Sequence, residues 1–137
     1  MNIDQIMTRK TITVGMDDDV RKVKDLFEKH RFHHLLVIEQ GRLVGVISDR
    51  DLLRNVSPFI GKLSERSQDM STLNRRVHQI MRRKLVTISS TMKVEEAAQV
   101  MLEQRVSCLP VVMADGHVVG VVTWRDLLGG LCGLTRD

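Results

Sequence analysis

Two similar stretches, one in each half of the chain, decide the fold: GRLVGVISDRDLL at residues 41–53 and GHVVGVVTWRDLL at residues 116–128. Each has a glycine turn, a short apolar run, and then a hydroxyl residue followed three places later by an aspartate. Upstream, residues 6–40 align with residues 80–114 at a constant offset of 74, and Asp115 is a one-residue insertion. Solenoid proteins need three or more repeats to bury a continuous core, so two copies indicate a face-to-face pair.

Both copies predict the same order of elements, β-α-β-β-α. Short strands are expected at residues 11–14 and 85–88, and apolar strands at 35–38, 43–47, 109–113 and 118–122, where β-branched residues are frequent. Turns with acidic or hydroxyl side chains at 17–19 and 89–91 suit helix N-caps. The amphipathic helices that follow have their apolar faces at Val20, Val23, Leu26 and Phe27, and at Val94, Ala97, Ala98, Met101 and Leu102.

The fold class is therefore α/β, with two β-α-β-β-α repeats packed as a pseudo-two-fold pair. We expect the first domain at residues 1–56, a polar connector at 57–79 and the second domain at 80–137. The sequence Ser71-Thr72, followed by Leu73, Val77 and Ile80, could begin a short helix at the end of the connector.

Composition excludes several classes of protein. The net charge of +4 comes from basic residues interleaved with acids, and the densest run, Arg82-Arg83-Lys84, is too short to follow a nucleic-acid backbone. The chain has no C-x-x-C pair, no signal-peptide core and no window near the ~20 apolar residues of a membrane span. We expect a cytoplasmic protein with free, mostly buried thiols and no contact with a membrane.

The S/T-x-x-D pattern, Ser48 with Asp51 and Thr123 with Asp126, has two interpretations. It resembles a capping box, in which the hydroxyl and the acid bond backbone N–H groups at a helix start. It is also suited to ligand binding, because a helix start attracts anions and an aspartate can accept both hydroxyls of a ribose. Both roles can coexist in one site.

These features resemble the CBS-domain family, and the pair resembles a Bateman module similar to stand-alone bacterial proteins of the acetoin-utilisation regulatory family. The motifs that carry the resemblance are IMTRKTITV, HRFHHLLVIEQGRLVGVISDRDLL, IMRRKLVTI and QRVSCLPVVMADGHVVGVVTWRDLL. The resemblance implies clefts between the copies that hold AMP, ADP, ATP or S-adenosylmethionine as a regulatory ligand. It also implies a homodimer and an effector protein of unknown identity.

The resemblance assigns residues to two clefts. The first cleft would use Lys10, Ile12, Phe32, His33, Thr123, Arg125 and Asp126. The second cleft would use Lys84, Val86, Val106, Ser107, Ser48, Arg50 and Asp51. In both, the aspartate would hold the ribose, the hydroxyl would lie at the sugar–phosphate junction, and the arginine and lysine would reach phosphate oxygens.

The two copies differ in the loop before the second strand. The family favours proline there, which copy two has as Pro110, whereas copy one has Leu36. Copy one also has bulky Phe32 and His33 where copy two has Val106 and Ser107. We therefore expect the cleft with Asp51 to be the more regular adenosine site.

The sequence holds no metalloprotease H-E-x-x-H, no G-x-S-x-G elbow and no Walker A loop, so we expect no catalytic activity. His30, His33 and His34 have no neighbouring acid or cysteine to complete a metal site, and no metal is expected. Two alternatives to a nucleotide sensor remain: a structural dimerisation or scaffold module with empty clefts, and a weak nucleic-acid binder.

Overall fold

The computed structural model describes residues 1–55 and 72–134. They form two compact units. Of the described residues, the copy-one unit comprises 12–40, 44–55 and 72–85, and the copy-two unit comprises 1–11, 41–43 and 86–134. The first residues of the chain thus pack with the second repeat, and the residues just before the second repeat pack with the first. The spatial units differ in this respect from the sequence ranges 1–56 and 80–137.

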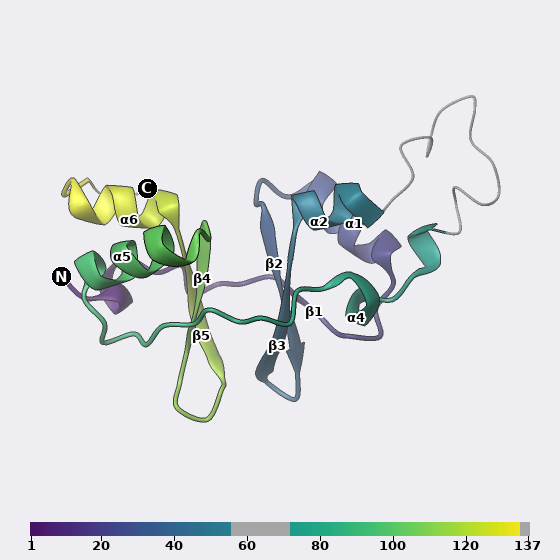
Figure 1. The fold of residues 1–137 in the computed structure, drawn as a ribbon, viewed down its shortest axis with the longest axis horizontal. Coiled ribbons are helices and arrows are strands. Elements are labelled where there is room, and N and C mark those ends of the chain that lie inside the picture. Colours follow the sequence, from purple (N-terminus) through teal and green to yellow (C-terminus); the bar gives the residue numbers. More distant parts are fainter. Residues whose placement is uncertain (56–71, 135–137) are drawn as a thin grey trace. The chain divides into compact units, whose positions relative to one another are not determined.

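The copy-one unit contains a three-stranded sheet in the order β1 (Thr13–Val14), β2 (His34–Glu39), β3 (Arg42–Ser48), with β3 belonging to this unit from Val44 onward. Strands β1 and β2 are parallel, with Thr13 opposite Leu36. Helix α1 (Val20–Lys29) packs against α2 (Asp49–Asn55), as Figure 1 shows. The 3-10 helix η2 (Thr72–Asn74) and helix α4 (Val77–Ile80) complete the unit. The expected short helix at the end of the connector is therefore present, while residues 57–71 lie outside the described residues.

The copy-two unit contains the antiparallel hairpin β4 (Cys108–Val112) and β5 (Val118–Thr123), in which Cys108 is opposite Thr123. Helix α5 (Val94–Gln104) packs against α6 (Trp124–Leu131), and the 3-10 helix η1 (Ile3–Gln5) belongs to the same unit (Figure 1). The strand expected at residues 85–88 is reduced to a single parallel bridge between Ile88 and Val111. The predicted repeat is otherwise confirmed.

A short lead segment before each repeat, residues 1–8 and residues 75–82, supplies backbone groups to its unit in the same way. The Met1 carbonyl accepts a hydrogen bond of 3.1 Å from the first N–H of α5, at Val94. The Arg75 carbonyl accepts the corresponding bond of 2.8 Å from the first N–H of α1, at Val20. Helix N-terminal N–H groups have no partner within the helix, so each lead segment satisfies one of them.

This arrangement corrects one expectation about helix capping. Asp19 caps α1 as predicted, accepting a bond from the Lys22 N–H. The hydroxyl turn at 89–91 does not cap α5, whose N-cap is Lys93 with no side-chain bond. The hydroxyls of Ser89 and Thr91 bond each other at 2.9 Å instead.

Each unit has its own apolar core, to which the lead segments contribute. Val77, Ile80 and Met81 are buried in the copy-one core, and Ile3 and Met7 are buried in the copy-two core. Leu102 is an exception to the predicted helix face, since it is 80% exposed. It lies beyond the stripe of Val94, Ala97 and Met101 that α5 buries.

Two glycines allow the lead segments to approach the strands. Thr8 forms an antiparallel bridge with Val121, and Arg82 forms one with Val46. Beside the first bridge, a Cβ on Gly120 would lie 2.9 Å from the Thr8 carbonyl oxygen and 2.9 Å from the Met7 sulfur. Beside the second, a Cβ on Gly45 would lie 2.5 Å from the Met81 sulfur. The second glycine of each decisive motif, Gly45 or Gly120, is therefore required by the close approach of the lead segment.

We expect Gly120→Ala to destabilise the protein by about 1–3 kcal/mol, because the added methyl group overpacks a site bounded by backbone. Urea unfolding followed by circular dichroism measures the change. Gly15→Ala is the control, because the nearest atom to its added Cβ is at an ordinary 3.6 Å. A Gly120→Ala variant as stable as the parent would contradict the close approach.

The two cysteines should differ sharply in reactivity. Cys108 is buried in β4, and burial raises the pKa of its thiol to about 12, whereas Cys132 is exposed. Because the thiolate is the reactive form, a disulfide reagent at pH 8 should modify Cys132 in the native protein and Cys108 only after denaturation. Peptide mapping of the labelled protein identifies the site. Rapid labelling of native Cys108 would show that β4 is open to solvent.

Candidate functional site

The hydroxyl and the aspartate of each S/T-x-x-D motif bond each other's backbone. In copy one the Ser48 N–H donates to Asp51 Oδ2 at 2.9 Å, and the Asp51 N–H donates to Ser48 Oγ at 3.1 Å. In copy two the Thr123 N–H donates to Asp126 Oδ2 at 2.9 Å, and the Asp126 N–H donates to Thr123 Oγ1 at 3.4 Å. The capping interpretation is therefore confirmed in both copies. The cap also fixes the orientation of the two carboxylates.

Asp51 and Asp126 are the buried charged residues in the described part of the chain, with exposed fractions of 6% and 2%. Carboxylates are almost never fully buried unless they are paired. Aspartates within a surface helix turn are normally solvated, so capping alone does not require this degree of burial. The same unusual feature at the same place in both repeats indicates a role beyond capping.

Asp51 has a charged partner that the sequence did not predict. Arg82 Nε donates to Asp51 Oδ1 at 2.9 Å, and the arginine side chain is 57% exposed. Burial alone would raise the pKa of Asp51, but the Ser48 N–H, the Arg82 guanidinium and the Ser48 hydroxyl together hold that pKa below its ordinary value. Asp51 is therefore ionised at neutral pH.

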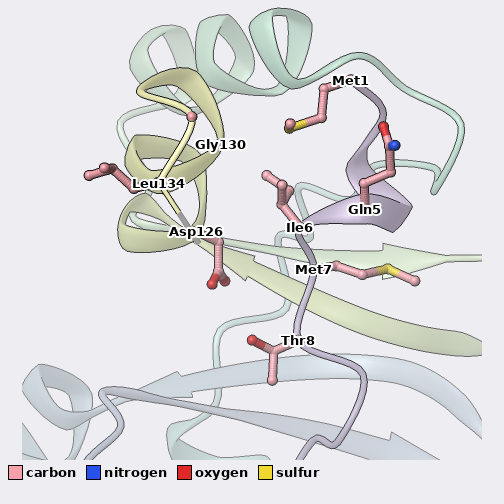
Figure 2. Close-up of a pocket in the computed structure, with 10 residues that line it drawn as sticks. Met1, Gln5, Ile6, Met7, Thr8, Asp126, Gly130 and Leu134 are labelled. Atoms are coloured by element: carbon pink, nitrogen blue, oxygen red, sulfur yellow. The ribbon is translucent and has the colours of Figure 1, made fainter. Parts of the chain in front are cut away.

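Asp126 lines a pocket of about 540 Å³ in the copy-two unit. The pocket lies between α6 and the first lead segment, as Figure 2 shows, with the Asp126 carboxylate and Thr8 both at its border. Ile6 and Met7 give the pocket apolar surface, and Gly129 and Gly130 add no side chain that would fill it. The lining is mixed, because Gln5, Thr8 and Asp126 add polar groups to these apolar side chains.

The other predicted site residues divide between the two units. The copy-one unit contains Ile12, Phe32, His33, Ser48, Arg50, Asp51 and Lys84. The copy-two unit contains Lys10, Val86, Val106, Ser107, Thr123, Arg125 and Asp126. Each predicted cleft contains residues from both units, so the grouping of these residues into two clefts stays a prediction.

Within each unit, the loop before the second strand lies against the S/T-x-x-D motif of the same copy. The Asp49 N–H donates to the His33 carbonyl at 3.0 Å, and the Trp124 N–H donates to the Ser107 carbonyl at 3.2 Å. Asp49 Oδ2 also lies 2.8 Å from His33 Nδ1. The predicted loop residues are thus neighbours of the motif through their backbone carbonyls.

The predicted apolar and cationic groups have distinct environments. Ile12, Phe32, Val86 and Val106 are half-buried and pack on the edges of the two cores. Lys10, Arg50, Lys84 and Arg125 are exposed, and the Arg125 guanidinium lies 5.8 Å from the centre of the Trp124 ring. Exposed cations of this kind can turn toward a phosphate without breaking a buried contact.

The histidines have separate partners. The His30 ring stacks on Phe32 at 5.4 Å, whereas His33 pairs with Asp49. Burial is the main cause that lowers the pKa of His34 below its usual value. Across residues 1–55 and 72–134, no group of His, Cys, Asp and Glu is arranged to hold a metal ion. No helix within these ranges is long and apolar enough to cross a bilayer.

The repeat offset could have identified the residues that the sequence prediction missed. Thr8 and Arg82 correspond at the offset of 74, directly after the paired Met7 and Met81. Their role depends on the tertiary structure, in which the lead segment of each repeat lies in the unit of the other copy. A sequence pattern does not show which copy a lead segment joins.

Comparisons with known proteins agree with this architecture. The family model for the CBS domain matches residues 3–58 and 77–133. A CBS domain-containing protein of Dictyostelium discoideum is 34% identical over 128 residues, covering 92% of this chain and 88% of the relative.

Two solved structures share the fold over nearly the whole chain. CBSX2 in complex with AMP has a TM-score of 0.81 and 26% identity, covering 98% of each chain. A Vibrio cholerae protein assigned to acetoin utilization (AcuB) has a TM-score of 0.79 and 22% identity, covering 97% of this chain and 91% of that one. The resemblance to the CBS-domain family is confirmed, and the likeness to the acetoin-utilization protein is one of fold.

The lowered pKa of Asp51 predicts a pH-dependent contribution to stability. A carboxylate whose folded pKa lies below the unfolded value of about 3.9 stabilises the fold above that value, and this contribution is lost as the pH falls through the folded pKa. Asp51→Asn should therefore be less stable than the parent by about 1–3 kcal/mol at pH 7. The difference should shrink near pH 3.

Urea unfolding at both pH values checks this expectation. Asp25→Asn, at an exposed position of α1, is the control and should change stability little at either pH. If the difference in unfolding free energy between the parent and Asp51→Asn is the same at both pH values, the assigned ionisation of Asp51 is contradicted.

Proposed function

Because this chain belongs to the CBS domain family, we propose that it is a regulatory module that binds an adenosine-containing ligand and performs no chemical step itself. The observation that carries the proposal is the buried, oriented carboxylate at the same place in both repeats. At Asp126 this carboxylate also borders a pocket of about 540 Å³. That volume is in the range of sites for small molecules and cofactors.

The chemistry of the carboxylate suits a ribose. An ionised carboxylate is only an acceptor, with about four lone-pair sites on its two oxygens, and a ribose presents two adjacent hydroxyl donors. Asp126 Oδ2 accepts from the Thr123 N–H, and this bond holds the carboxylate in place before a ligand arrives. Preorganisation of this kind increases affinity because less freedom is lost on binding.

The ligand class follows from chemistry and from a similar protein. In the predicted cleft with Asp126, Ile12 suits an adenine ring, and exposed Arg125 and Lys10 suit a phosphate. In the predicted cleft with Asp51, Val86 and Val106 suit the ring. CBSX2, which is similar over the full length, binds AMP. We therefore take AMP as the first candidate, with ADP, ATP and S-adenosylmethionine as the other members of the class.

Regulation would arise from differential affinity. A ligand that binds one arrangement of the protein more tightly shifts the population toward that arrangement by the difference in binding free energy. The signal would pass to an effector protein or to a homodimer contact. Helix α6 offers an exposed apolar stripe for such a contact, formed by Trp124, Leu128 and Leu131, each about half exposed.

AMP at 1 mM should raise the melting temperature of the parent protein, because a ligand that binds only the native state stabilises it. Asp126→Asn should weaken AMP binding at its site by about tenfold or more, since a charged acceptor for the ribose is lost. The fluorescence of Trp124, the one tryptophan of the chain, reports this site because it lies in the same helical turn as Asp126.

Asp115→Asn is the matched control, because Asp115 is an exposed aspartate of the same unit and lies outside the predicted clefts. It should bind AMP like the parent. If no adenosine-containing ligand changes the melting temperature or gives heat in calorimetry, the scaffold alternative replaces the nucleotide sensor. If the protein instead binds oligonucleotides with an affinity that falls steeply with salt, the nucleic-acid alternative replaces the nucleotide sensor.

A further inference from the structure

Arg82 is held both through its backbone and through its side chain. Its N–H donates to the Val46 carbonyl at 2.9 Å, and the Val46 N–H donates to the Arg82 carbonyl at 3.1 Å. Its Nε donates to Asp51 Oδ1 at 2.9 Å. Asp51 is only 6% exposed and is itself held by the Ser48 N–H, so the guanidinium is bonded to a carboxylate that cannot turn freely.

The bond through Nε leaves most of the Arg82 guanidinium open. A guanidinium has five N–H donors, one on Nε and four on the two terminal nitrogens. Within residues 1–55 and 72–134, the terminal nitrogens of Arg82 form no hydrogen bond, and the side chain is 57% exposed. The two terminal nitrogens are therefore available to a ligand.

The neighbouring arginines are arranged in the opposite way. Each uses a terminal nitrogen to bond a neutral acceptor: Arg75 the Asn55 side chain, Arg76 the Asp17 carbonyl and Arg83 the His78 carbonyl. Arg82 differs from them because its bond is through Nε and its partner is a carboxylate. The part of the guanidinium that best binds an anion is thus occupied in its neighbours and open in Arg82.

A guanidinium held in this way suits a phosphate group. Its terminal N–H groups match two phosphate oxygens at once, and such bidentate pairs are among the strong hydrogen bonds. Because the side chain is fixed before binding, it loses less conformational freedom when the anion arrives. Exposed Arg50 is adjacent to Asp51 in the chain, and exposed Lys84 follows Arg82 by two residues. These further cations of the same unit offset the negative charge of Asp51, which would otherwise repel an anion.

We propose that Arg82 is an anion-binding residue for a phosphate group, and that Asp51 is the positioning residue that orients it. This goes beyond the proposed function, because it gives the Asp51 carboxylate a role that needs no ribose. It also adds a phosphate ligand to Arg50 and Lys84, which the sequence predicted for this role. The phosphate group belongs either to a nucleotide or to a free inorganic anion, and the experiment distinguishes these two sources.

Calorimetry of the full chain with pyrophosphate measures binding of the anion alone. Arg82→Gln should weaken this binding by about tenfold, because it keeps the length of the side chain and removes the charged fork. Arg82→Lys should recover only part of the affinity, since an ammonium keeps the charge but cannot bond two oxygens in the same way. Arg83→Gln is the matched control, which removes the same charge one residue along and should change the affinity little. If Arg83→Gln weakens binding as much as Arg82→Gln does, the inference is wrong.

The role of Asp51 is tested by the sign of its effect on pyrophosphate binding. If Asp51 only repels the anion, removing its negative charge tightens binding. If Asp51 orients Arg82, Asp51→Asn weakens binding by about threefold or more, and it has no further effect in the Arg82→Gln background. Circular dichroism and melting curves establish that each variant is folded. An Asp51→Asn variant that binds pyrophosphate as tightly as the parent, or more tightly, overturns the positioning role.

Parallel titrations with AMP and adenosine identify the source of the phosphate and separate this inference from the proposed function. If a nucleotide supplies it, the parent binds AMP more tightly than adenosine, and Arg82→Gln removes the difference. If AMP and adenosine bind equally, a free anion is the ligand of Arg82. If pyrophosphate binding depends on Arg82 but neither AMP nor adenosine binds, this inference stands and the proposed function fails. If pyrophosphate does not bind at millimolar concentration, or binds Arg82→Gln like the parent, this inference is wrong whatever AMP does.

Discussion

The structure depends on a pair of backbone bridges that join each lead segment to a strand. Thr8 with Val121 and Arg82 with Val46 are held by reciprocal N–H to carbonyl bonds of 2.9–3.1 Å. The bridges require Gly120 and Gly45, because a side chain there would meet the neighbouring segment. Through them, each short lead segment closes the core of its unit and satisfies the first N–H of a helix.

These bridges also place the candidate sites. The residue after Met7 and the residue after Met81 are brought opposite the helices that carry Asp126 and Asp51. The same contact that closes the core thus decides what faces the carboxylate. A change in a lead segment therefore affects stability through the methionine and ligand binding through the next residue, and the two effects are separable by substitution.

The aspartates combine two roles that are usually assigned to different residues. As helix caps they stabilise the start of α2 and α6, and as buried anions they need a donor to compensate the loss of water. In the copy-one unit, Arg82 supplies that donor. A ligand hydroxyl can supply the same compensation, which is why burial of a capping carboxylate is informative about binding.

The repeat symmetry is close in the backbone and imperfect in the side chains. Both units have the same S/T-x-x-D caps, bridges and glycine approaches. They differ at Thr8 against Arg82, at Asp49 against Trp124, and at the first strand, which in copy two is only the bridge at Ile88. A repeated fold can therefore carry two sites with different affinities, since few side chains decide what each site accepts.

The sequence by itself determined the α/β repeat, most helix and strand positions, and the two S/T-x-x-D motifs. These features follow from local patterns: apolar spacing, glycine turns and a hydroxyl–acid pair three residues apart. It did not show that Leu102 is exposed, or that the turn at 89–91 leaves α5 uncapped. It also did not show that Arg82 bonds Asp51. Only the tertiary structure decided these points, because each depends on which segment packs against which unit, and a contact between residues 31 positions apart leaves no periodic trace in the sequence.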